Sequence, residues 1–157
     1  MTIRLRPVAP SDMDQIFAFE SDPLSVHMAA FTPKDPSDRD AFDLHWQRIL
    51  ADPLVINRAI EADGALVGTI ASFVIEGDRE VTYWIDRAQW GRGIASAALA
   101  LLLDEDAERP LWGRAVDDNV GSLRVLERAG FVVVGEDTGF APGRGEDVRE
   151  IVLRLDA

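Results

Sequence analysis

Apolar and polar residues follow two different periods along the first fifty positions of the chain. The segment 3–8 alternates apolar and other residues like a short strand. Ser11 stands where a helix N-cap is expected, and a helix is predicted over about 12–21. Its apolar positions would face inward, and they are Met13, Ile16, Phe17 and Phe19. Three prolines interrupt 22–40, which predicts a long loop or a broken helix there, and a second helix should start at Ser37 or Asp38 and run to about Leu50.

Strand patterns dominate the middle of the chain. The segments 54–62 and 65–75 are separated by Asp63-Gly64, a strong signal for a hairpin. After a turn at 76–79, another strand is expected over 80–86.

The second half predicts helices between further strands. The helix over about 94–107 is apolar almost all round, which is typical of a buried helix. The remaining elements are a strand over 110–116, a helix over 119–129 stopped by Gly130, and a final hairpin of 132–140 and 148–155. Together these elements predict an α/β (α+β) fold: one domain over 1–157, with a mixed, mostly antiparallel central sheet and helices on both faces.

Composition narrows the class of protein. The 157 residues are 47% hydrophobic, and no apolar run reaches the length of a membrane-spanning helix. The N-terminus lacks the long apolar core of a signal peptide, so we expect a cytoplasmic protein without a membrane partner. The absence of cysteine excludes disulfides, thiolate metal sites and cysteine nucleophiles.

The net charge of −12 makes binding to nucleic acid unfavourable and attracts cations, amines among them. An anionic ligand would need a local group of basic side chains or free backbone N–H donors. This requirement is a test of any phosphate site proposed from the sequence.

One segment has the pattern of such a site. The strand that ends near Ile85 is followed by a short turn containing Gly91-Arg92-Gly93, and a helix begins at once. Glycines let the backbone approach a ligand closely, and the free N–H groups of a helix N-terminus favour an anion such as a pyrophosphate. Taken alone, the two glycines are equally consistent with a tight turn that binds nothing.

Further residues make the pattern more specific. Glu80-Val81-Thr82-Tyr83-Trp84-Ile85 precedes the glycine turn, and the segment 118–131, beginning Asp118-Asn119 and ending Gly130-Phe131, follows a strand about 25 residues later. With Trp90-Gly91-Arg92-Gly93-Ile94-Ala95 these segments resemble the GNAT superfamily of N-acetyltransferases. The RimJ/RimL-like branch is the most similar in pattern, since a tryptophan at the position of Trp90 departs from the general superfamily turn but is familiar in that branch.

The resemblance implies that acetyl-CoA is the co-substrate and assigns residues to it. The pyrophosphate would lie on the turn formed by Gly91, Arg92, Gly93, Ile94, Ala95 and Ser96. Tyr83, Trp84 and Ile85 would run beside the pantetheine arm. Asn119 would bond the pantetheine, and Ser122 would lie near the sulfur. Without the resemblance, Asn119 is a good N-cap with Ser122 at the third helical position. Four arginines near the turn (Arg87, Arg92, Arg124 and Arg128) would supply the local positive charge, whereas Arg109 and Arg114 need only be solvated.

Three residues are candidates for the chemistry. Glu80 would accept the proton of the attacking amine, through water, although a carboxylate at a strand edge is an equally good interpretation. Thr82 and Trp84 share its face and would line the acceptor site. Tyr83 or Ser122 would protonate the departing thiolate.

The predicted function is therefore N-acetyl transfer from acetyl-CoA to a primary amine, either a protein N-terminus or a small-molecule amine, without a metal. The alternative is a catalytically inactive acyl-CoA-binding module of the same fold, acting as a sensor or interaction unit. A nucleotide-binding protein of another type ranks last because no phosphate-binding lysine motif is present. His27 and His45 have no third ligand at metal spacing. The oligomeric state stays open, with a homodimer among the states allowed.

Overall fold

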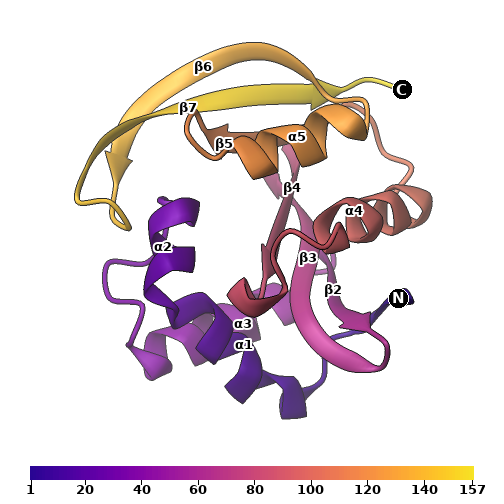
Figure 1. Cartoon of the computed structure of the whole chain (residues 1–157), viewed down its shortest axis with the longest axis vertical. Coiled ribbons are helices and arrows are strands. Elements are labelled where there is room, and N and C mark those ends of the chain that lie inside the picture. Colours follow the sequence, from indigo (N-terminus) through magenta and orange to yellow (C-terminus); the bar gives the residue numbers. More distant parts are fainter.

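The computed structural model describes residues 1–157 and contains one seven-stranded sheet with the strand order β1-β2-β3-β4-β5-β7-β6 (Figure 1). The strands are β1 (Ile3–Pro7), β2 (Ile56–Ala62), β3 (Ala65–Ile75), β4 (Asp78–Ile85), β5 (Leu111–Val116), β6 (Val132–Ala141) and β7 (Glu146–Leu155). The α-helices are α1 (Met13–Ser21), α2 (Pro23–Ala29), α3 (Arg39–Ala51), α4 (Ile94–Glu105) and α5 (Val120–Arg128). All neighbouring strands are antiparallel except β4 and β5, so the predicted mixed and mostly antiparallel sheet is confirmed.

Two tight turns connect β2, β3 and β4. Asp63 and Gly64 have φ values of 50° and 84°, and Glu76 and Gly77 have φ values of 51° and 86°. Positive φ at both central residues is what a two-residue type I′ hairpin requires. The predicted Asp63-Gly64 hairpin is confirmed, and the second turn is shorter than the predicted 76–79 because β4 already begins at Asp78.

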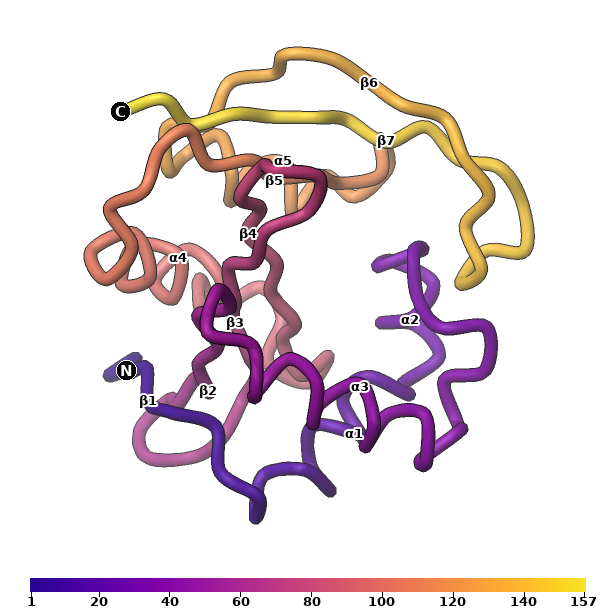
Figure 2. The backbone as a smooth tube through the Cα atoms, turned by 180° about the vertical axis from the view of Figure 1, so that it is seen from behind, coloured from indigo at the N-terminus to yellow at the C-terminus, as the bar shows by residue number.

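Helices cover both faces of the sheet, as predicted. On β4, the indole Nε1 of Trp84 donates to the carbonyl of Phe19 in α1, whereas the Tyr83 hydroxyl meets Ser122 of α5. Successive strand residues point to opposite faces, so α1 and α5 lie on opposite sides of β4. Figures 1 and 2 show α1, α2 and α3 grouped together, apart from α4 and α5.

The main core lies between the sheet and the helices α4 and α5. Nine of its members are no more than 1% exposed, and they are Ile60, Ile70, Ile94, Ala98, Leu99, Leu102, Leu111, Leu126 and Leu153. Four of these residues belong to α4, which confirms that the predicted apolar helix packs into the core. Full burial of a large aliphatic side chain contributes roughly 1.5–3 kcal/mol, so this cluster anchors α4 and α5 on the sheet.

Three local predictions differ from the structure. The N-cap of α1 is Asp12, not Ser11, and Asp12 is held by a bidentate bond from Arg6. Within 22–40, where a long loop or a broken helix was predicted, Asp22 caps a regular helix at Pro23–Ala29. The helix predicted to reach residue 107 ends at Glu105, because Asp106 leaves it to accept a hydrogen bond from Ser72 in the core.

The strands β4 and β5 separate soon after they meet. They pair only at Arg79 with Leu111 and at Glu80 with Trp112, although β4 continues to Ile85. Beyond Glu80, the edge of β4 that faces β5 therefore has no strand partner. The sheet opens at this point, and the candidate site lies in the opening.

Candidate active site

The turn that precedes α4 is built on two glycines with left-handed backbone. Gly91 and Gly93 have φ values of 77° and 78°. A Cβ at either position would meet no other heavy atom within 4 Å. The backbone conformation, and not a lack of space, is therefore what requires glycine at these two positions. The same open space leaves the backbone accessible to a ligand.

The helix that follows starts without a cap. Gly93 provides no side chain, and the backbone N–H groups of Ile94, Ala95 and Ser96 donate no hydrogen bond, the first being from Ala97 N to Gly93 O at 3.1 Å. By contrast, α2, α3 and α5 are capped by Asp22, Asp38 and Asn119. Free N–H groups at the positive end of a helix form an anion-binding site, as the sequence predicts here.

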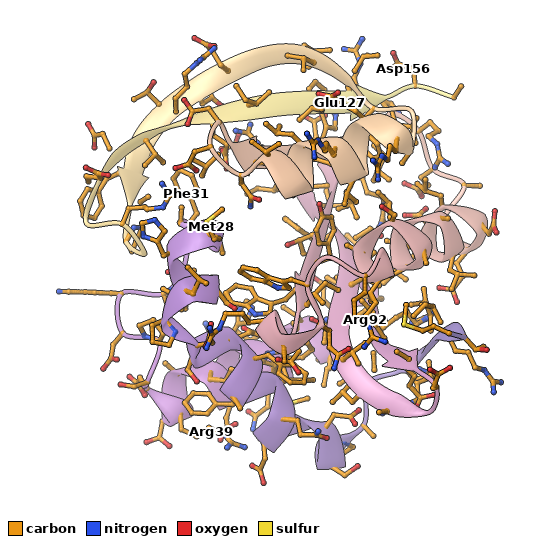
Figure 3. All side chains as sticks on the ribbon, in the orientation of Figure 1. Met28, Phe31, Arg39, Arg92, Glu127 and Asp156 are labelled. Carbon is orange, nitrogen blue, oxygen red and sulfur yellow. The ribbon has the colours of Figure 1, made fainter.

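A single cavity of about 1350 Å³ connects this turn with the opening between β4 and β5. Gly91, Gly93 and the first turn of α4 line one end of it. Tyr83 and Ser122 line it where the strands separate, and Glu80 and Trp112 line the other end. All residues predicted to contact acetyl-CoA or to take part in the chemistry line this cavity except Arg92 (labelled in Figure 3). The guanidinium of Arg92 donates to the side chain of Gln89 on the turn before α4.

The hydroxyl groups of Tyr83 and Ser122 form a pair. Their oxygens are 2.5 Å apart, which brings together the two residues predicted to protonate the thiolate. Burial raises the pKa of Tyr83, and the hydrogen bond with Ser122 opposes that rise. The phenol is therefore protonated at neutral pH and is able to donate a proton.

Asn119 has two structural contacts. Its Oδ1 accepts from the backbone N of Ser122 at 3.3 Å, which confirms the predicted N-cap. Its Nδ2 donates to the carbonyl of Met28 in α2 at 3.4 Å, a long hydrogen bond that links α5 to the opposite wall. The side chain also lines the cavity, so it is positioned beside the space predicted for the pantetheine.

Glu80 belongs to an ion-pair cluster that the sequence did not reveal. Its Oε1 accepts from Arg114 Nε at 3.0 Å. The same guanidinium donates to Asp137 at 2.7 Å and to Glu150 at 3.1 Å. Glu80 and Glu150 are only 17% and 16% exposed. Arg114 is thus not merely solvated, and Glu80 is more than an isolated carboxylate at a strand edge.

Glu150 is the functional candidate that sequence reasoning missed. It lines the cavity from β7, and burial raises its pKa, with the hydrogen bond to Arg114 opposing the rise. The charges of Glu80 and Asp137 raise it further. Only the pairing of β5 with β7, which places Glu150 opposite Val116, brings this residue beside Arg114. No local motif marks it.

The basic residues predicted near the pyrophosphate divide into two groups. Arg124 and Arg128 line the cavity from α5 and form no ion pair. Arg87 and Arg92 do not line it, and Arg87 is paired with Asp22 at 2.9 Å. Free N–H groups together with two unpaired arginines meet the requirement that a net charge of −12 imposes on an anion site.

Other parts of the chain are arranged as follows. No three His, Cys, Asp or Glu side chains come together in the way that a metal site needs. None of the helices combines the length and apolar character that crossing a membrane requires. His27 uses its backbone carbonyl to accept from Arg144, which ties α2 to the β6–β7 hairpin.

Comparison with known proteins shows which family the sequence matches. The family model described as "Acetyltransferase (GNAT) domain" matches residues 2–132. The "Probable N-acetyltransferase YjcK" of Bacillus subtilis (strain 168) is 35% identical over 78 residues, which cover 45% of this chain and 43% of that protein. The matched region thus spans less than half the length of this curated relative.

Solved structures share the fold over nearly the whole chain. RimJ of Mycobacterium smegmatis, in complex with CoA-disulfide, has a TM-score of 0.81 at 22% identity, covering 99% of this chain and 82% of that chain. Spermidine N-acetyltransferase from Vibrio cholerae, in complex with CoA and spermine, has a TM-score of 0.80 at 18% identity, covering 97% and 95%. At such identities the likeness establishes the fold, and the predicted α/β class is confirmed.

Proposed function

This chain belongs to the acetyltransferase (GNAT) family, and from that premise we propose that it transfers the acetyl group of acetyl-CoA to a primary amine. The amine is a protein N-terminus or a small molecule, and residues 1–157 act as one acetyl-CoA-dependent domain. One observation carries the proposal. A single cavity joins an uncapped helix N-terminus to a hydroxyl pair and to a partly buried carboxylate cluster.

The residues at one end of the cavity fit the anionic part of acetyl-CoA. The N–H groups of Ile94, Ala95 and Ser96 would bind the pyrophosphate, with Arg124 and Arg128 providing positive charge. The unpaired edge of β4 from Tyr83 to Ile85 would hydrogen-bond the amides of the pantetheine. A free backbone N–H on this edge would also donate to the acetyl oxygen as negative charge develops there.

Acetyl-CoA supplies an activated thioester, from whose sulfur the acetyl group passes to the amine nitrogen as the C–S bond breaks and a C–N bond forms. Glu80 accepts the proton that the ammonium group must lose, directly or through one water. Arg114 holds the Glu80 carboxylate in place from β5. The other oxygen of Glu80 remains available for the proton.

The Tyr83–Ser122 pair returns a proton to the sulfur. The raised pKa of Tyr83 keeps its phenol protonated, and the 2.5 Å contact with Ser122 lets the pair act as one donor. Solvent restores the proton to the pair afterwards. The roles of base and acid are thus separated on β4, with Glu80 on one face and Tyr83 on the other.

Assignment to the RimJ/RimL-like branch is part of the same proposal. It is supported by Trp90, whose indole Nε1 donates to the carbonyl of Ile85 at 2.9 Å and fixes the end of β4 against the glycine turn. A protein N-terminus is the acceptor that this branch suggests.

The first experiment measures CoA thiol release from acetyl-CoA in the presence of pooled primary amines and peptides. We expect turnover for the wild type, and we expect Glu80→Gln to lower kcat by roughly 10²–10⁴-fold, the usual contribution of general acid–base catalysis. Binding of acetyl-CoA should barely change, because Glu80 lies away from the anion site.

Asp137→Asn is the matched control. Asp137 also bonds Arg114 but does not line the cavity. Its substitution therefore tests whether loss of any one ion-pair partner of Arg114 is enough to lower kcat. A similar fall in kcat for both variants would contradict the assignment of Glu80 as the general base. Binding of acetyl-CoA without thiol release for any amine would instead favour an inactive acyl-CoA-binding module.

A further inference from the structure

The charges that line the cavity are separated by sign. The two arginines of α5, Arg124 and Arg128, carry the positive charge at the cofactor end. All of the acidic lining residues belong to the opposite end, and they are Glu76, Asp78, Glu80 and Glu150. Only one cation, Arg114, lines that end with them.

The charge of Arg114 is already more than balanced by the carboxylates around it, so it offers no net positive charge to a substrate anion. Its guanidinium already donates to Glu80, Asp137 and Glu150 at 3.0, 2.7 and 3.1 Å. Three carboxylates around one guanidinium leave a net negative charge. The cluster is therefore suited to a further cation, and it would repel a carboxylate.

The walls around this cluster are apolar and aromatic. Strand register places Phe73 and Trp112 on either side of Glu80, so that an aromatic residue flanks the carboxylate on each neighbouring strand. Met28 and Phe31 line the cavity from the end of α2 and the residues after it (Figure 3). Aromatic faces attract a cation and also bury an apolar arm.

We propose that the acceptor is a primary ammonium group on an apolar, preferably aromatic, arm with no carboxylate beside it, and that Glu150 binds this ammonium and sets the selectivity. This inference rests on the proposed acetyl transfer. Glu150 lies on β7, beyond the region that the family model matches. An amine with its own neighbouring carboxylate would place that group against Glu80 and Glu150, with no free cation to receive it.

Two sources present the required chemistry, a free arylalkylamine and the N-terminus of a peptide with an apolar first residue. Three acceptors that share one indole distinguish them. Tryptamine lacks the carboxylate, tryptophan amide replaces it with a neutral amide as a peptide does, and tryptophan retains it. Spermidine adds positive charge without an apolar arm.

The experiment measures kcat and KM for these four acceptors at saturating acetyl-CoA. We expect kcat/KM to be at least about tenfold higher for tryptamine or for tryptophan amide than for tryptophan, because a unit charge a few ångströms away is worth at least that factor at a partly buried site. A preference for tryptamine would identify a free arylalkylamine as the acceptor, and a preference for tryptophan amide would identify a peptide N-terminus. Higher kcat/KM for tryptophan or for spermidine than for both carboxylate-free indoles would overturn the proposal.

Glu150→Gln tests the assigned residue. It should raise KM for tryptamine about tenfold with little change in kcat. The ratio of kcat/KM for tryptamine to kcat/KM for tryptophan should therefore become smaller. Intrinsic differences between the amines cancel when this ratio is compared between two enzymes. Glu136→Gln is the control, because Glu136 is an exposed carboxylate paired with Arg149 outside the cavity.

An unchanged ratio in a folded Glu150→Gln variant would overturn the role of Glu150. If that variant does not fold, the wild-type comparison of tryptamine with tryptophan still decides the substrate class. Thiol release with tryptophan as the preferred acceptor would contradict only the inference. The absence of thiol release with every amine would contradict the proposed transferase itself.

Discussion

At the scale of single residues, Arg114 organises the acidic end of the cavity, which we propose as the acceptor end. It holds carboxylates from β4, β6 and β7, so the C-terminal hairpin is linked electrostatically to the strand that carries Glu80. Removing one partner from a partly buried ion cluster leaves an uncompensated charge, which costs more than the pair itself contributes. Substitutions at Arg114 would therefore disturb geometry as well as charge, and for that reason the carboxylates make sharper tests.

Glu20 is a partly buried carboxyl group outside the candidate site. Burial raises its pKa from the ordinary value of 4.5 to about 7, and the nearby indole of Trp46 opposes the rise, although Trp46 Nε1 makes no hydrogen bond of normal geometry. At a pH between these two pKa values, Glu20 holds a proton in the folded state that it has released in the unfolded chain. The contribution of Glu20 to stability is thus full below pH 4.5 and is lost as the pH rises through 7.

Glu20→Gln should therefore stabilise the protein at pH 8 relative to the wild type, by up to about 3 kcal/mol, since each pKa unit corresponds to ~1.4 kcal/mol. At pH 5 the difference should be much smaller. Urea unfolding at the two pH values measures it. Glu127→Gln, at an exposed position of α5 without an ion pair, should show no such change (Figure 3). A stability difference that is equal at both pH values would contradict the assignment of Glu20.

At the scale of elements, the proposed cofactor site depends on the N-terminus of α4. Gly93→Ala places a side chain at φ 78°, a conformation that costs an alanine about 1–2 kcal/mol. Relief of this strain would turn the N–H groups of Ile94 and Ala95 away from the cavity. We expect the affinity for CoA to fall by about tenfold or more, as measured by calorimetry.

Gly64→Ala is a matched control for that strain. Gly64 has φ 84° and, like Gly93, no heavy atom within 4 Å of an added Cβ, but it lies in the β2–β3 hairpin and does not line the cavity. Both variants should lose similar stability, and only Gly93→Ala should lose affinity for CoA. Equal CoA affinities in the two folded variants would show that the turn does not hold the cofactor.

Most elements could be predicted from the sequence because their signals are local. Asp63-Gly64 determines a hairpin through its own backbone preferences, and the apolar run of α4 requires burial wherever the helix packs. The helix at Pro23–Ala29 also has a local signal, an Asp22 cap followed by proline at the first position, but the prolines at 33 and 36 obscured it.

The acceptor end of the site could not be predicted in the same way. Glu80, Arg114 and Glu150 are separated by 34 and 36 positions and meet only through the register of β4, β5 and β7. A one-residue change of register would turn any of these side chains to the other face. The glycine turn and the uncapped start of α4 could be predicted more completely, since they are contiguous in the chain.

At the scale of the whole molecule, the net charge and the opening in the sheet both bear on how the ligands would bind. A net charge of −12 attracts cationic acceptors from a distance and disfavours CoA, so the cofactor must be bound by local donors. The opening of the sheet between β4 and β5 provides one continuous cavity in which these donors and the acidic acceptor end lie apart.

A crystal structure of the wild type with CoA would test this arrangement most directly. We predict pyrophosphate oxygens about 3 Å from the backbone nitrogens of Ile94, Ala95 and Ser96, and the sulfur beside the Tyr83–Ser122 pair, between β4 and β5. The space between Glu80 and Glu150 should remain open for the acceptor. Ordered CoA bound elsewhere, with the turn at Gly91–Ser96 empty, would contradict the proposed active site.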